Sequence, residues 1–332
     1  MSIAHADLVV IWYLLLTFTL LLVVLLDGFS MGVGILSLFV SREKDRGLMM
    51  ASLGSIWHAN QTWLVVLGAL LFGAFPLAFG LVLSALYIPV ALMLLGFIFR
   101  GVSLEYYDYA DNKRLWSLAF GLGSLAAATA QGFALGALFE GLPLAGERFA
   151  GGPWFWLSPF SALACLCVLG AFCLSGAAWL VLKTSGDLQA KARHGTRAAA
   201  FFLLLAGPAL ILWSLGLHPF LQRMWFSWPG LLLTSLPLVV AIAIFLALIV
   251  CLSQGKEGAS FLSALLLITF ILIGLLGSIF PILVPPTLTV FQAASKTITL
   301  EFMLVGMVFM LPLMLAYNAY HYWVFRGKTD AD

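Results

Sequence analysis

Three short segments place ionisable or strongly polar side chains inside long apolar runs. Asp27 ends the run LLVVLL, and His58 and Asn60 lie near the start of a second run. Arg100 and Glu105 lie at the end of a third run. Ionisable groups in hydrocarbon are costly, so each is a candidate for function by default. Side chains of these types support proton transfer and hydrogen bonding between helices.

Asp27 begins the segment DGFSMGVG of residues 27–34. It lies 13 residues before residue 40, where the apolar run ends, and this distance is roughly 20 Å along a helix. Gly28 and Gly32 form a small-residue face that lets another helix approach closely. Asp27 therefore either carries protons or pairs with a neighbouring helix for structure, because an unpaired carboxylate there would cost several kcal/mol.

His58 lies among donors and acceptors that Trp57, Asn60 and Gln61 supply. Three hypotheses fit this setting. The imidazole relays protons near neutral pH, or it ligates a haem iron, or it only hydrogen-bonds to a neighbour. Haem ligation by two histidines is disfavoured, because the other four histidines fall in loops or at the ends of the apolar runs.

Arg100 and Glu105 are five residues apart, which separates them by about 140° around a helix. They therefore do not face each other, and we expect each to reach a different partner. Snorkelling of both side chains to the membrane interface is an equally plausible interpretation.

The elements that position these residues follow from the composition. Of 332 residues 63% are hydrophobic and 9% are charged, against roughly 25% charged in an average soluble domain. Such a chain cannot cover its exterior with polar groups, which excludes a soluble enzyme, a disordered chain and a nucleic-acid binder. The long unbroken apolar runs also exclude an outer-membrane barrel. The four cysteines lie in apolar runs without a CxxC pair, which favours core packing over a metal site or a disulfide.

A membrane-crossing helix needs about 20 mostly apolar residues, and the sequence predicts an all-α polytopic protein with about nine such spans in one membrane domain, 1–332. The predicted spans are 8–40, 53–75, 79–104, 115–139, 157–182, 198–217, 230–252, 259–283 and 300–325. The first lacks a basic leader and is too long for a cleaved signal peptide, so we expect it to be retained. Nine spans place 13 of the 16 basic residues on one side. The positive-inside rule then predicts an outside N-terminus and a cytoplasmic C-terminus.

The same segments resemble those of a known family. Residues 26–34, LDGFSMGVG, resemble the D-G-F-D-x-G-x-G segment in helix 1 of subunit II of cytochrome bd-type quinol oxidases. Residues 57–64, WHANQTWL, resemble that family's W-D-G-N-x-x-W-L segment, and residues 99–106, FRGVSLEY, resemble its F-R-x-V-x-x-E-x segment. Gln131-Gly132, Phe280-Pro281 with Pro285, and the ending YWVFRGK of residues 322–328 fit as well. The short length and residues 83–87, LSALY, look closest to the cyanide-insensitive branch.

The resemblance implies a subunit of nine helices in the bacterial cytoplasmic membrane that ligates no haem and no other metal and has no catalytic residue of its own. Haems b and d and the site for ubiquinol or menaquinol would lie in the partner, subunit I. A small accessory subunit, membrane lipids and a bound quinone or lipid are further expected partners. This chain would help protons or oxygen reach the active centre, with Asp27, His58, Asn60 and Glu105 as candidates for the proton pathway. Gly28, Gly32, Trp57 and Arg100 would serve packing and structure.

Two departures from the family pattern affect that pathway. Ser30 stands where the family has a second aspartate in helix 1, and His58-Ala59 stands where helix 2 has aspartate and glycine. A free histidine has a pKa near 6.5 rather than near 4. Either the relay is retuned here, or protons enter by another route.

Two other functions compete with this one. The first is a proton-coupled secondary transporter, although no pair of broken helices occurs at matching positions in two halves of the chain. The second is a purely structural partner that only stabilises subunit I. Co-purification of a haem-bearing protein discriminates against the transporter, and the effect of Asp27→Asn on turnover discriminates against the structural partner.

Overall fold

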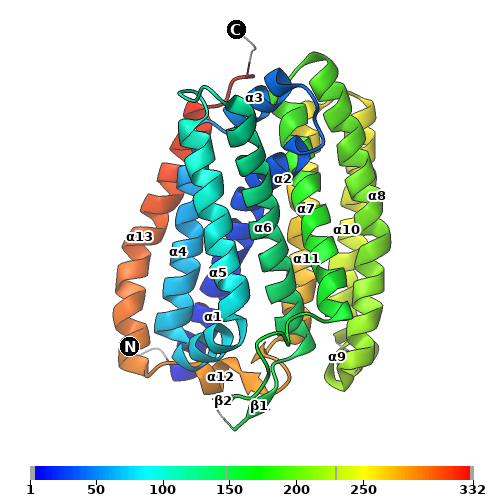
Figure 1. The fold of residues 1–332 in the computed structure, drawn as a ribbon. Coiled ribbons are helices and arrows are strands. Elements are labelled where there is room, and N and C mark those ends of the chain that lie inside the picture. The colour runs from blue at the N-terminus through cyan, green and yellow to red at the C-terminus, as the bar shows by residue number, and fades with distance from the viewer. Residues whose placement is uncertain (1–3, 147, 229, 330–332) are drawn as a thin grey trace.

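The computed structural model describes residues 4–146, 148–228 and 230–329. Its long helices run side by side, and short elements close the two ends (Figure 1). The first helix has three parts: α1 (His5–Leu22), the π-helical turn η1 (Val23–Asp27) and α2 (Gly28–Ser37). The other helices are α3 (Glu43–Ala51), α4 (Ile56–Ala74), α5 (Pro76–Tyr106), α6 (Lys113–Glu140), α7 (Pro159–Lys183), α8 (Gly186–Leu217), α9 (Pro219–Phe226), α10 (Gly230–Ser253), α11 (Glu257–Ile279), α12 (Val290–Ala293) and α13 (Thr297–Val324).

Two antiparallel hairpins lie at one end of the bundle, which we call the hairpin end. They pair β1 (Leu144–Ala145) with β2 (Arg148–Phe149) and β3 (Ile282–Val284) with β4 (Leu288–Thr289). The opposite end, which we call the α3 end, carries α3 (Figure 1). The first helix begins at the hairpin end and α13 finishes at the α3 end (Figure 1). The α3 end is therefore the one for which the charge distribution predicts the cytoplasmic side.

Eight helices in the described part of the chain are long and apolar enough to cross a membrane. They coincide with eight of the nine predicted spans. The remaining predicted span falls on α4, whose 19 residues reach about 29 Å but include His58, Asn60 and Gln61 in the first two turns. The all-helical membrane fold is confirmed, and the count of nine crossings stays a prediction.

Two helix boundaries differ from the predicted spans for clear reasons. The span predicted at 259–283 ends at Ile279, because Pro281 lacks an N–H group and holds Phe280 in an extended conformation. The span predicted at 198–217 begins twelve residues earlier, at Gly186. Those added residues are mostly polar, so hydropathy alone excludes them from a membrane span. Their helix propensity nevertheless allows the helix to continue through them.

The first helix packs closely on α7 through its glycines. A Cβ atom on Gly32 would lie 1.8 Å from the carbonyl oxygen of Phe172, and one on Gly28 would lie 2.7 Å from the Phe172 ring. Glycine at position 32 therefore permits a backbone contact that no other residue fits. In lipid such packing, rather than release of water, drives helix association.

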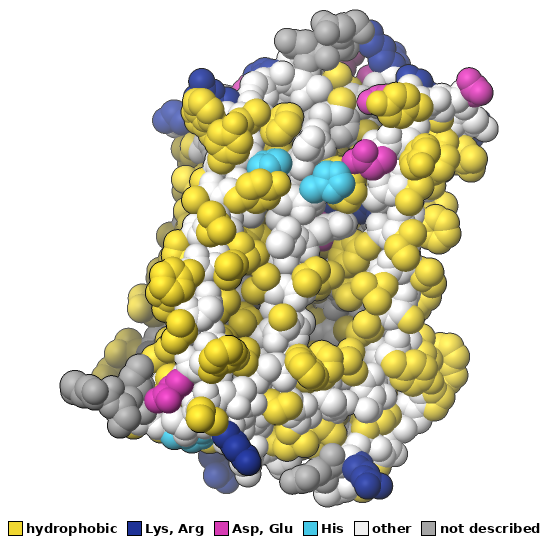
Figure 2. All heavy atoms as spheres, turned by 90° about the vertical axis from the view of Figure 1, so that its left-hand side faces the viewer, with side chains coloured by type: hydrophobic (Ala, Val, Ile, Leu, Met, Phe, Trp, Pro, Cys, Tyr) yellow, Lys and Arg dark blue, Asp and Glu magenta, His cyan; other side chains and the backbone are white. Residues whose placement is uncertain are grey.

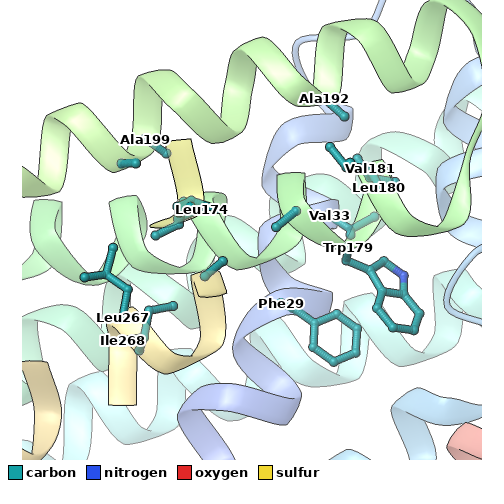
Figure 3. Close-up of a cluster of buried hydrophobic side chains, with 14 of the residues drawn as sticks. Phe29, Val33, Leu174, Trp179, Leu180, Val181, Ala192, Ala199, Leu267 and Ile268 are labelled. Carbon is teal, nitrogen blue, oxygen red and sulfur yellow. The ribbon is translucent and has the colours of Figure 1, made fainter. Parts of the chain in front are cut away.

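The largest buried cluster lies where α2, α7, α8 and α11 meet (Figure 3). Phe29 of α2 stacks on Trp179 of α7 with ring centroids 4.5 Å apart. Phe261 of α11 meets both rings edge-on, and Tyr322 of α13 does the same at 6.3–6.4 Å. Four separate helices thus meet in one aromatic cluster beside the end of η1.

The outer face formed by α13, α4 and α5 is a band of hydrophobic side chains between two charged ends (Figure 2). Of the eight membrane-crossing helices, α13 has the smallest buried share. A groove of about 320 Å³ separates part of α13 from α1 and α4, and Met303, Met307, Met310 and Met314 contribute to its lining. The helix α13 therefore has the smallest contact with the rest of the chain among the eight helices that are apolar enough to cross a membrane.

Residues 325–329 fasten the end of α13 to α7. The ammonium of Lys183 donates hydrogen bonds to the carbonyl oxygens of Phe325 and Gly327, and it lies 5.1 Å above the Trp179 ring. The amide of Thr329 donates to the Lys183 carbonyl at 2.8 Å. A buried lysine is stable only with such partners, so this segment is an integral part of the α3 end.

Candidate functional site

Asp27 and Arg100 form a buried ion pair between η1 and α5. Arg100 Nη2 lies 2.8 Å from Asp27 Oδ1, and the two side chains are 0–1% exposed. The hydroxyl of Ser30 donates to Asp27 Oδ1 at 3.0 Å and to the Asp27 carbonyl at 2.8 Å, and it accepts from Arg100 Nη2. A guanidinium is permanently charged, so this cluster is neutral overall only while Asp27 is ionised.

The local sequence explains how this pair is positioned. The π-turn ends on Asp27, and such turns occur frequently at functional sites. Arg100 lies in the penultimate turn of α5, with its guanidinium carbon 5.9 Å from the Phe97 ring centre. Ser30, at the position of the family's second aspartate, leaves one carboxylate for one guanidinium.

The pair is not saturated by protein partners. Asp27 Oδ2 and Arg100 Nε and Nη1 have no hydrogen-bonding side-chain or backbone partner within the described residues. Buried polar groups are normally satisfied. Asp27 therefore keeps one carboxylate oxygen available to a proton or a water molecule while the other oxygen holds Arg100.

Asn60 connects α4 to the π-turn. Its Nδ2 donates to the carbonyl oxygen of Leu26 at 2.7 Å, immediately before Asp27, and Tyr322 of α13 donates to its Oδ1 at 3.1 Å. Asn60 is fully buried. The residue that sequence reasoning missed is Tyr322, because nothing in its local pattern indicates a contact 262 positions away.

His58 and Glu105 form a second pair, separate from the first. His58 Nε2 lies 2.9 Å from Glu105 Oε1, and these side chains are 54% and 56% exposed. The His58 ring stacks on Trp57 with centroids 3.7 Å apart. Arg100 and Glu105 thus reach different partners, as their spacing predicts. The predicted proton-pathway residues therefore divide into two groups. Asp27 of η1 and Asn60 of α4 are buried, with Arg100 of α5 beside Asp27, whereas His58 of α4 and Glu105 of α5 are half-exposed.

The second pair also gives a physical reading of the substitution at position 58. An imidazole beside Glu105 can form a hydrogen bond with the carboxylate, and an ion pair when it is protonated. Two ionised carboxylates are acceptors only and repel each other, so an aspartate at this position would need a proton to bond with Glu105.

Other titratable groups in the described residues serve the ends of the bundle. His218 Nε2 lies 2.6 Å from the Phe139 carbonyl oxygen. Tyr107, just after α5, donates to Glu43 at 3.2 Å, and burial together with the charge of Glu43 raises the pKa of Tyr107 to about 12. No group of three or more His, Cys, Asp or Glu side chains between residues 4 and 329, apart from the undescribed positions 147 and 229, is arranged to hold a metal ion.

The fold and the site together define a multi-pass helical membrane subunit with a buried ion pair beside a π-turn. Residues 8–325 match the family described as cytochrome bd terminal oxidase subunit II. The chain therefore belongs to that family and is a subunit of a cytochrome bd-type terminal oxidase in the bacterial inner membrane. This finding confirms the family that the sequence resembles, and it replaces the transporter alternative.

Individual relatives agree along nearly the whole chain. The cytochrome bd-I ubiquinol oxidase subunit 2 of Escherichia coli (strain K12) is 27% identical over 363 residues, covering 97% of this chain and 95% of that protein. The cytochrome bd ubiquinol oxidase subunit 2 of Bacillus subtilis (strain 168) is 28% identical over 337 residues, with 96% of each covered. The fold is similar to a chain in the structure of bd oxidase from Geobacillus thermodenitrificans, with a TM-score of 0.81, 19% identity, and coverage of 96% of this chain and 98% of that chain.

Proposed function

We propose that this chain is the non-haem subunit of a quinol:oxygen oxidoreductase, in which subunit I carries haems b and d and oxidises ubiquinol or menaquinol. The observation that carries the proposal is the family match over residues 8–325, together with relatives named as ubiquinol oxidase subunits.

The surface that docks subunit I is, in this proposal, the face of α4, α5 and α13. The helix α13 is the least buried of the membrane-crossing helices, and its Phe302, Val305 and Phe309 are 62–81% exposed. Lipid alone would cover these apolar side chains. The half-exposed His58–Glu105 pair lies on the same face, in the first turn of α4 and the last turn of α5, and offers a docked protein a polar group to bind. A protein partner with a polar group at that level would cover the apolar side chains and bind this pair.

The proposed role in turnover is proton delivery toward the haems of the partner. His58 and Glu105 lie where a proton can be taken up at the docking face. Asn60 joins that part of α4 to the backbone beside Asp27. Asp27 keeps one oxygen free of protein partners, so the buried carboxylate can hold a proton without losing its bond to Arg100.

Docking is tested with two matched valine substitutions. Val305 on α13 and Val239 on α10 are 62% and 61% exposed, but only Val305 lies on the proposed docking face. Val305→Trp is expected to reduce the amount of haem-bearing subunit that co-purifies with the tagged chain, because an interface has no room for an indole. Val239→Trp is expected to leave it unchanged, because lipid adapts to the added ring. An equal yield from both variants contradicts the assigned face, and the absence of any haem protein from the wild-type preparation contradicts the proposed function.

Proton delivery is tested by removing Asp27 in two ways. Asp27→Asn alone leaves Arg100 without its counter-ion, so it is compared with the double variant Asp27→Asn/Arg100→Met, which removes both charges. We expect oxidase turnover per haem to be lower than wild type in both variants. In the double variant we also expect the haem content of the complex to be normal. Wild-type turnover in the double variant would show that Asp27 serves structure only.

A further inference from the structure

The π-turn that ends on Asp27 accepts a hydrogen bond from a side chain of another helix, α4. A π-helical turn departs from the regular α-helical pattern, and in this one the Leu26 carbonyl accepts a hydrogen bond from Asn60 Nδ2 at 2.7 Å. Asn60 is fully buried. The next residue after Leu26 is Asp27, so any movement of this carbonyl also moves the carboxylate that faces Arg100.

Tyr322 and the Leu26 carbonyl together set the orientation of the Asn60 amide. The phenol of Tyr322 donates to Asn60 Oδ1 at 3.1 Å, and Asn60 Nδ2 donates to the Leu26 carbonyl on the side of η1. Without the phenol donor Oδ1 loses its partner, and the amide is held only by its bond to Leu26. The Tyr322 ring also meets Phe29 and Trp179 edge-on, so the phenol is itself fixed in place.

We propose that Tyr322 is a positioning residue for Asp27 that acts through Asn60 and the π-turn. It joins α13, the least buried membrane-crossing helix, to the buried ion pair on the first helix. A contact that moves α13 would therefore move Tyr322 and, through Asn60 and the Leu26 carbonyl, the carboxylate of Asp27. The effect of this arrangement on turnover rests on the proposed function, but the arrangement itself does not.

The test is an infrared measurement on the purified, assembled oxidase. The carboxylate band of Asp27 is identified as the band that is missing both from Asp27→Asn, which keeps the guanidinium of Arg100, and from the double variant Asp27→Asn/Arg100→Met. Its frequency depends on the hydrogen bonds and the charge around the carboxylate. We expect Tyr322→Phe, which removes only the hydroxyl, to shift this band, and Asn60→Leu to shift it in the same direction. The combined variant Tyr322→Phe/Asn60→Leu is expected to shift the band no further than Asn60→Leu does, because the Tyr322 hydroxyl acts through the Asn60 amide.

The matched control is Tyr109→Phe, which removes a hydroxyl from an 88% exposed tyrosine and is expected to leave the band in place. An unshifted band in Tyr322→Phe overturns the inference, and so does a combined variant in which the two shifts add. Turnover of the Asp27 variants is measured on the same preparations. If the band does not shift in Tyr322→Phe but the Asp27 variants turn over slowly, the positioning role of Tyr322 is contradicted and proton delivery is not. If the band shifts in Tyr322→Phe but the Asp27 variants turn over at the wild-type rate, proton delivery is contradicted and the positioning role is not.

Discussion

The buried Asp27–Arg100 pair makes a sharp energetic prediction. Both side chains are excluded from solvent, with nitrogen and oxygen 2.8 Å apart. Removing one partner from a buried pair leaves an uncompensated charge and costs about 3–5 kcal/mol. Since each 1.4 kcal/mol is about a factor of ten, Arg100→Met or Asp27→Asn should lower the ratio of folded to unfolded chain by roughly two to four orders of magnitude.

The double variant Asp27→Asn/Arg100→Met should recover most of that loss, because it leaves no unpaired charge at this site. The assay is thermal unfolding of the purified complex, followed by tryptophan fluorescence and by retention of the partner subunit. We expect a large fall in the melting temperature for each single variant and near wild-type melting for the double variant. A single Arg100→Met variant that melts like the wild type would refute the reasoning, since it would mean that water or lipid headgroups already solvate the Asp27 carboxylate.

Three further outcomes are expected from other parts of the fold. Gly32→Ala should prevent assembly, because its Cβ would lie 1.8 Å from the carbonyl oxygen of Phe172, whereas Gly68→Ala meets nothing within 4 Å and should give wild-type yield of the complex. Lys183→Met removes charged hydrogen bonds to residues 325–327, worth about 1.5–3 kcal/mol each, and should make this segment a target for limited proteolysis that the wild type resists. The pKa of Tyr107 is raised to about 12 from 10.0. The stability that the neutral phenol contributes is therefore complete below pH 10 and is lost as the pH rises toward 12. The melting temperature of Tyr107→Phe should fall less than that of the wild type between pH 10 and pH 12.

The sequence predicts the helical layout well, because apolar runs of this length have few alternative structures. It also singles out Asp27, His58, Arg100 and Glu105, because ionisable residues are rare in such runs. The pairing among them is not visible in the sequence. Asp27 and Arg100 are 73 positions apart, and which of the acids Arg100 reaches depends on how α5 packs against the first helix. Periodicity within one helix carries no information on that packing.

The π-turn and the fastening of the chain end were beyond prediction for the same reason. One helix over the run 8–40 would be about 50 Å long in a hydrocarbon layer of about 30 Å, which predicts a strong tilt, a kink near the glycines, or protrusion. The structure has a π-turn at Val23–Asp27, directly before the glycines, and Asn60 on α4 binds its Leu26 carbonyl. Likewise, nothing around Lys183 indicates that its ammonium binds carbonyl groups more than 140 positions away.

The polarity of α4 has a consequence for how the protein is made. Its first turns carry His58, Asn60 and Gln61, so its apolar residues are concentrated in the rest of the helix. The translocon partitions segments into the bilayer by their apolar content, so these polar side chains lower the tendency of α4 to enter the bilayer alone. The hydrogen bond from Asn60 to η1 gives one of them a partner inside the bundle. A substitution that makes α4 more apolar would therefore ease its entry into the lipid while removing the bond that shapes the π-turn.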